Sequence, residues 1–90
     1  MKKYTFTAFV VANADGVIIS KAIEGSLPTC QSKLKTCKDI FGMSLLNASI
    51  SDGKNILFSS KNRIEDAEAY VRGWDRGYEW SRDTLNGVLA

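Results

Sequence analysis

The chain has 90 residues and a formal net charge of +2, with 44% hydrophobic and 24% charged residues. This composition is that of an ordinary globular domain and excludes a disordered or fibrous chain. The charge balance is too mild to favour a dedicated nucleic-acid binder, which usually carries a basic stripe. No segment approaches the roughly 18 consecutive apolar residues of a membrane span.

The first residues imitate a secretory signal, because Met1–Lys3 precede an apolar run and Ala12–Ala14 resembles a cleavage site. The run is only about eight residues long, and Thr5 and Thr7 interrupt it in the alternating pattern of a strand. Two cysteines without partners suit a reducing compartment. We therefore expect a cytoplasmic protein, of a bacterial or phage-infected host cell.

The first half of the sequence predicts two strands and a helix. Residues 3–12 alternate as a strand, Gly16 permits the positive φ of a tight hairpin turn, and residues 17–24 form a β-branched strand. Ser26 is a typical N-cap. We expect a helix from Leu27 to Phe41 that stops at the glycine after it.

The second half repeats this order. Met43–Ser51 and Asn55–Ser60 read as strands on either side of an Asp-Gly turn. Asn62, followed three residues later by a glutamate, resembles a capping box. The final helix is expected to run from Arg63 to about Leu85.

Two Asp-Gly turns, at Asp15 and Asp52, lie 37 residues apart and suggest an internal repeat. The apolar stripes of the two predicted helices match at the same offset. They pair Leu27 with Ile64, Cys30 with Ala67, Leu34 with Val71, Cys37 with Trp74, and Phe41 with Tyr78. We predict repeat units at about 3–42 and 43–88; the alternative is two independent β-β-α units of similar length.

The segments Ala14–Ser20 and Ile50–Ile56 carry a resemblance to the small YegP-like family, whose repeats run strand, glycine turn, strand, helix. The resemblance implies an antiparallel sheet with both helices on one face and brings no catalytic residues. We therefore expect a single α+β domain over residues 1–90. Its order is a β-β-α-β-β-α tandem repeat, with a four-stranded antiparallel sheet and two helices on one face.

Catalytic and metal-binding patterns are missing from the sequence. There is no histidine, which removes the commonest general base and metal ligand. Cys30 and Cys37 lie two helical turns apart, about 10.5 Å along the axis, too far for a disulfide or for one zinc ion. We read them as small core residues and expect no enzyme, no cofactor and no metal.

Lysines gather on the first predicted helix, at Lys33, Lys35 and Lys38. They could contact nucleic acid, but at 100° per residue Lys33 lies on one flank of the apolar stripe and the other two toward the opposite flank. An ordinary solvated face is the favoured interpretation.

The last predicted helix contains one surface that its apolar stripe does not explain. In a continuous helix Trp74 and Tyr78 lie in the buried stripe, whereas Trp80 lies on the outer side, next to a notch formed by two glycines. Exposed tryptophan beside arginine is typical of interface hot spots. The predicted interface comprises Trp80, Arg76, Arg72, Gly73, Gly77 and Thr84.

Three structural alternatives compete with that interface. The helix could break at a glycine and turn Trp80 toward the core, Trp80 could cover a sheet edge, or Trp80 could stack on Arg76 as an intramolecular cation–π pair.

The sequence thus predicts a small non-enzymatic module that binds another protein, as an inhibitor does, or binds itself as a homodimer, without membrane or metal. In size and lack of catalytic residues it is similar to accessory proteins of phages and mobile elements, including anti-defence inhibitors such as anti-CRISPRs. The alternative is a nucleic-acid-binding accessory protein that uses lysine and arginine patches. An enzyme is the third class, without a recognisable constellation of catalytic residues.

Overall fold

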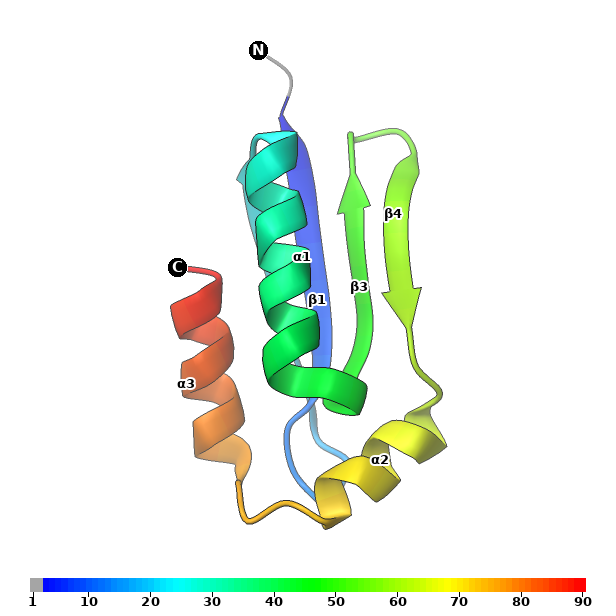
Figure 1. Ribbon diagram of the computed structural model, residues 1–90, viewed down its shortest axis with the longest axis vertical. Coiled ribbons are helices and arrows are strands. Elements are labelled where there is room, and N and C mark those ends of the chain that lie inside the picture. The colour runs from blue at the N-terminus through cyan, green and yellow to red at the C-terminus, as the bar shows by residue number, and fades with distance from the viewer. Residues whose placement is uncertain (1–2) are drawn as a thin grey trace.

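The computed structural model describes residues 3–90 as a four-stranded antiparallel sheet in the order β2-β1-β3-β4. Two helices, α1 and α3, pack on one face of this sheet, and α2 lies across one end of it (Figure 1). The elements in chain order are β1 (Tyr4–Val11), β2 (Ile18–Gly25), α1 (Leu27–Phe41), the 3₁₀ turn η1 (Gly42–Ser44), β3 (Leu45–Ser51), β4 (Ile56–Lys61), α2 (Ile64–Arg72) and α3 (Tyr78–Val88). The predicted α+β class and four-stranded antiparallel sheet are confirmed.

The two hairpins form where the glycine turns predict them. Gly16 has a φ of 82° and Gly53 a φ of 96°, the positive values that glycine adopts without a steric penalty. In the first turn the side-chain oxygen of Asn13 also accepts hydrogen bonds from the N–H groups of Asp15 and Val17. The turns therefore specify both hairpins locally.

The core lies between the sheet and the two helices on its face. On β1, Phe6, Ala8 and Val10 are completely buried, as the alternation predicts. From α1, Cys30 and Cys37 are also buried, which confirms their assignment to the core. Burial raises the pKa of Cys37 to about 11, so the thiol stays protonated at neutral pH.

Helix α1 begins and ends as the sequence predicts. The Oγ atom of Ser26 accepts the N–H of Thr29 at 3.4 Å, which satisfies one free donor of the first turn. The helix ends at Gly42, whose φ of 56° disfavours any residue with a side chain. The chain then enters η1 and returns into β3 at the centre of the sheet.

The continuous final helix predicted for residues 63–85 is wrong. The segment forms α2 and α3, separated by residues 73–77, and the two helices point in different directions (Figure 1). The capping box is also wrong, because the side chain of Asn62 donates to the carbonyl of Leu45 at 2.8 Å and the N-cap of α2 is Arg63. The tandem repeat is not confirmed, since one half ends in one helix and the other in two.

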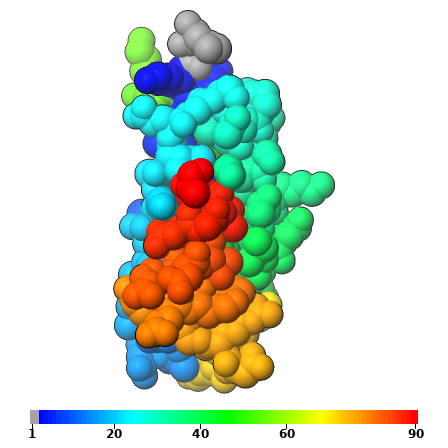
Figure 2. Space-filling view, turned by 90° about the vertical axis from the view of Figure 1, so that its left-hand side faces the viewer, coloured from blue at the N-terminus to red at the C-terminus, as the bar shows by residue number. Residues whose placement is uncertain are grey.

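Helix α3 returns from the end of the sheet to its face. It lies between β2 and α1, and Figure 2 shows it as the orange and red segment between them. Its buried residue Leu85 joins the same core cluster as Phe6 and Phe41. The break before α3 thus lets one amphipathic segment cover two different parts of the sheet.

Candidate functional site

The five residues that separate α2 from α3 include both glycines of the predicted interface. The N–H of Gly73 donates to the carbonyl of Tyr70 at 3.2 Å, and that of Trp74 donates to Val71 at 2.9 Å, which closes the last turn of α2. Gly77 has extended backbone angles and serves as the N-cap of α3. Each glycine therefore stands at a helix end, where its cost to helix stability is small.

Trp80 points into the molecule. Its ring meets Phe41 edge to face at a centroid distance of 5.9 Å and Trp74 at 5.5 Å. It is half-buried and packs against the main core cluster. The prediction that Trp80 lies on the outer side was wrong, because the helix breaks and rotates it toward α1.

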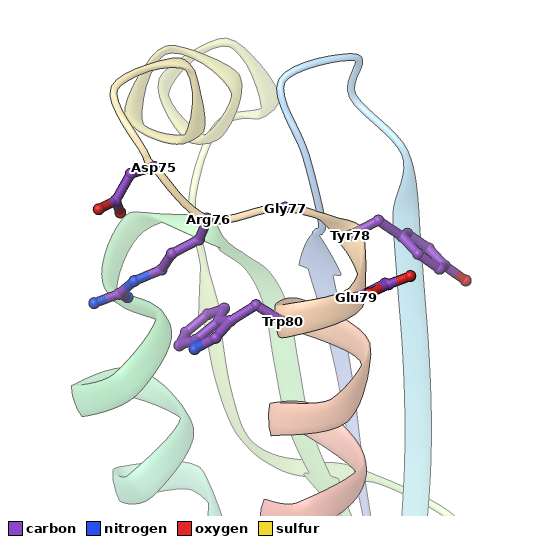
Figure 3. Close-up of a pocket in the computed structure, with 6 residues that line it drawn as sticks. All are labelled: Asp75, Arg76, Gly77, Tyr78, Glu79 and Trp80. Atoms are coloured by element: carbon purple, nitrogen blue, oxygen red, sulfur yellow. The ribbon is translucent and has the colours of Figure 1, made fainter.

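Arg76 covers the outer side of these indole rings. Its guanidinium lies 4.4 Å from the centroid of Trp80 and 5.6 Å from that of Trp74 (Figure 3). Cation–π contacts of this kind stabilise a fold by about 0.5–1 kcal/mol at exposed sites. Two of the structural alternatives for this region are thus found together: the helix breaks, and Arg76 stacks on Trp80.

An open hollow surrounds the start of α3. Its lining residues are Asp75, Arg76, Gly77, Tyr78, Glu79 and Trp80. Figure 3 shows Arg76 and Trp80 pointing to one side, and Tyr78 and Glu79 to the other. Because these groups diverge, the hollow holds no set of side chains that could act together on a small substrate.

The remaining residues of the predicted interface do not form one notch. Arg72 lies exposed on α2, whereas Thr84 is half-buried on α3. Tyr78 and Ile64 were both expected in the core, but they are 39% and 41% exposed. The predicted single notch was wrong. An interface role for the predicted residues stays a prediction; they are Trp80, Arg76, Arg72, Gly73, Gly77 and Thr84.

The lysines of α1 form no strong basic patch. Lys35 and Lys38 line a shallow hollow on the outside of the helix together with Asp39, whose carboxylate offsets their charge. Lys33 is half-buried and is not part of that hollow. Contact of these lysines with nucleic acid stays a prediction, with less support than protein binding.

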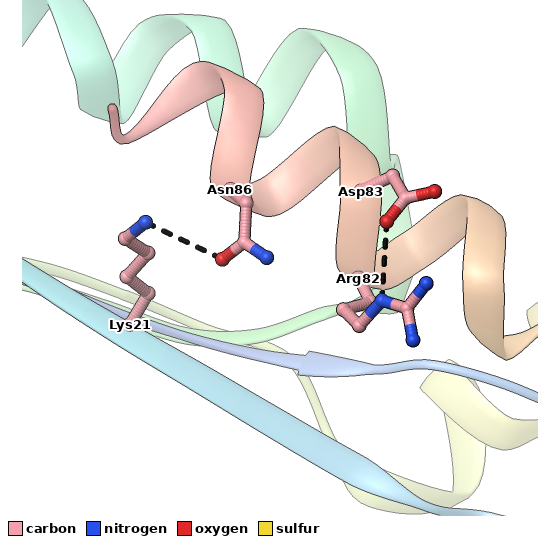
Figure 4. Close-up of polar contacts among 4 residues, drawn as sticks. All are labelled: Lys21, Arg82, Asp83 and Asn86. Carbon is pink, nitrogen blue, oxygen red and sulfur yellow. Dashed lines mark hydrogen bonds and ion pairs between the residues drawn. The ribbon is translucent and has the colours of Figure 1, made fainter.

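Helix α3 also holds the outer strand β2. Lys21 on β2 donates from Nζ to the side-chain oxygen of Asn86 on α3 at 3.3 Å (Figure 4). The buried hydroxyl of Ser81 donates to the carbonyl of Ala12, which follows β1, at 2.9 Å. The exposed pair of Arg82 and Asp83, also drawn in Figure 4, lies within α3 at 3.1 Å and contributes little.

The opposite outer strand, β4, has an exposed apolar surface that was not among the predicted sites. Ile56 is 66% exposed, and Leu57 and Phe58 are each 43% exposed. The signal was present in the sequence: three consecutive large apolar residues in an alternating strand cannot all face one core. In Figure 1, β4 lies at the edge of the sheet beyond α1, with no helix over it.

The sequence matches no protein-family model, and neither a curated protein nor a solved structure is significantly similar to it. The resemblance to the YegP-like family therefore stays a prediction. Among residues 3–90, no helix is long and apolar enough to cross a membrane. The same residues contain no group of three histidine, cysteine or acidic side chains placed to hold a metal ion.

Proposed function

We propose that this chain is a small non-enzymatic protein-binding module and that β4 is the strand through which it binds. The observation that carries the proposal is the exposure of Ile56, Leu57 and Phe58 on neighbouring positions of one outer strand. Single exposed apolar residues are common on protein surfaces, whereas three successive ones on an outer strand of a sheet favour an interaction site. A module of this kind acts on its partner by covering a surface, as an inhibitor does.

The region around α3 supports the proposal less well. Its tryptophans already pack against each other and against Phe41, so little of their surface is left for a partner. Arg76 is engaged with both indole rings. On β4, by contrast, none of the three large side chains belongs to a core cluster of the described chain.

Site-specific photo-crosslinking tests the proposal. The photoreactive residue p-benzoylphenylalanine replaces Phe58 in one variant and Tyr70, which is 41% exposed on α2, in a matched control. Both are expressed in the native host and irradiated. We expect Phe58 to capture a distinct protein, in a yield that falls when excess unmodified protein is present, and Tyr70 to capture none.

Two outcomes would contradict the proposal. Absence of any competed crosslink at Phe58 would show that β4 is not an interface. A competed crosslink to nucleic acid instead of protein would favour the alternative function, and its yield should then fall steeply between about 50 and 200 mM salt.

A further inference from the structure

The pairing register shows which backbone groups of β4 face outward. The N–H of Asn62, just after β4, donates to Leu46 at 3.0 Å, and from there the antiparallel register pairs Ser60 with Ala48 and Phe58 with Ile50. Hydrogen-bonded and non-bonded pairs alternate along an antiparallel ladder. The backbone groups of Ser59 and Lys61 therefore point away from β3.

No other strand of residues 3–90 reaches this outer edge. The ladder shifts register between Ile50 and Ser51, which leaves Leu57 as an extra residue on β4. A bulge and a lysine are ways in which proteins discourage pairing at an edge. Here they leave a regular edge from Phe58 to Lys61, next to the exposed side chains of Ile56 and Leu57.

The charges along this segment have one sign. Lys54 precedes β4, Lys61 ends it and Arg63 follows it, and no acidic residue lies between positions 54 and 63. Arg63 lies 3.7 Å from Glu65, whereas Lys54 and Lys61 form no ion pair within the part of the chain that the structure describes. Lys54 lies in the turn before β4 and Lys61 is the last residue of the strand, so the two lysines stand at opposite ends of β4.

This charge pattern argues against a second copy as the partner. A second copy would add a β4 strand with the same cations and with no carboxylate between positions 54 and 63. In any register that strand offers Lys54 and Lys61 no opposite charge, and like charges opposite each other destabilise a sheet.

We infer that β4 accepts an extended segment of a partner protein as a fifth strand, an inference that rests on the proposed function. The partner segment has an apolar centre and acidic residues at both ends. Backbone hydrogen bonds to Ser59 and Lys61 hold the segment, as in other cases of strand addition. Its apolar side chains contact Phe58 and its neighbours. Its carboxylates lie near Lys54 and Lys61.

Synthetic peptides provide the probe. The first has the sequence EEVTVTVEE, the second KKVTVTVKK, and the third EEVTPTVEE, in which proline prevents strand pairing without changing the charge. Each is titrated into the ¹⁵N-labelled full chain. We expect the first to bind and to slow hydrogen exchange at the Ser59 and Lys61 amides, and the other two to bind at least tenfold more weakly.

Charge reversal on the protein completes the test. Lys54→Glu with Lys61→Glu should weaken binding of EEVTVTVEE by roughly tenfold and improve binding of KKVTVTVKK. Lys35→Glu with Lys38→Glu makes the same change in net charge on α1, and should leave the preference unchanged. Amide spectra of both variants establish that the fold is retained.

The inference is overturned if the proline peptide binds as well as EEVTVTVEE, if the shifts centre on α3, or if the free protein dimerises through Ser59 and Lys61. The crosslinking experiment distinguishes failure of this inference from failure of the proposed function. A protein crosslinked at Phe58 without peptide binding would leave a protein-binding module that does not use strand addition. Peptide binding without any crosslinked protein would instead remove the support for the protein-binding function itself.

Discussion

The two halves of the molecule start alike and end differently. Each begins with an antiparallel hairpin whose turn contains a glycine at positive φ, Gly16 in one and Gly53 in the other. The first half then continues into one straight helix, α1, whereas the second continues into α2 and α3. The difference shows that the pattern of apolar residues specifies which residues can be buried, while the shape of the surface to be covered decides whether a helix stays continuous.

The contact between Phe41 of the first half and Trp80 of the second should be the most costly to break. Phe41 is completely buried, and Phe41→Ala should lower the free energy of unfolding by about 3–5 kcal/mol. Trp80→Ala should cost less, because Trp80 is only half-buried. Urea denaturation measures both, and a double-mutant cycle should show coupling between them; additive effects would mean that the rings do not interact.

A smaller loss is expected at the glycine that ends α1. Gly42 has a φ of 56°, and a Cβ atom there would lie 3.1 Å from the hydroxyl oxygen of Tyr70. Gly42→Ala should therefore destabilise the protein by about 1–3 kcal/mol. Urea denaturation of Gly42→Ala in a Tyr70→Phe background separates the backbone strain at residue 42 from the close contact with the Tyr70 hydroxyl. An unchanged midpoint for Gly42→Ala alone would contradict both effects.

The buried thiol of the first half should make stability sensitive to alkaline pH. The pKa of Cys37 rises from an ordinary value of 9.0 to about 11 in the folded protein. As the pH rises, the unfolded chain therefore loses its thiol proton before the folded protein does. The contribution of this thiol to the free energy of unfolding is constant below about pH 9 and falls between pH 9 and 11. Thermal unfolding at a series of pH values measures the decline, which should be shallower in Cys37→Ala.

The smallest effect is expected at the glycine that begins α3. Gly77 has a φ of −124°, and nothing lies within 4 Å of the position that a Cβ would occupy. Gly77→Ala should change the free energy of unfolding by no more than about 0.5 kcal/mol, because loss of chain entropy in the unfolded state offsets a poorer N-cap. A large loss in urea denaturation would show that the two helix-terminal glycines, Gly42 and Gly77, constrain the fold alike.

The hairpins and α1 could be predicted because their signals are local. Turn glycines and the Ser26 cap act over a few residues. The sequence raised a break of the last helix only as an alternative, since the apolar spacing of that helix continues through Gly73 and Gly77 without interruption. What breaks the helix is tertiary: α2 packs against Val11 at the end of the sheet, and α3 must turn to reach the face.

The surface around Trp80 and the exposed apolar residues of β4 also depend on tertiary structure. The surface around Trp80 was predicted from a helical projection, and it changed when the helix broke. The exposed group on β4 follows from three consecutive apolar residues, Ile56 to Phe58, in an outer strand. Locating it required the strand order, which places β4 at an edge beyond the helices.

The strand order also has a consequence for synthesis on the ribosome. β1 lies in the middle of the sheet, between β2 and β3, although it is the first strand in the chain. Its second neighbour, β3, is complete only about 40 residues after β1 ends. At roughly 5–20 residues per second, the nascent chain presents one unpaired side of its central strand for about 2–8 seconds, and chaperones have that interval in which to bind it.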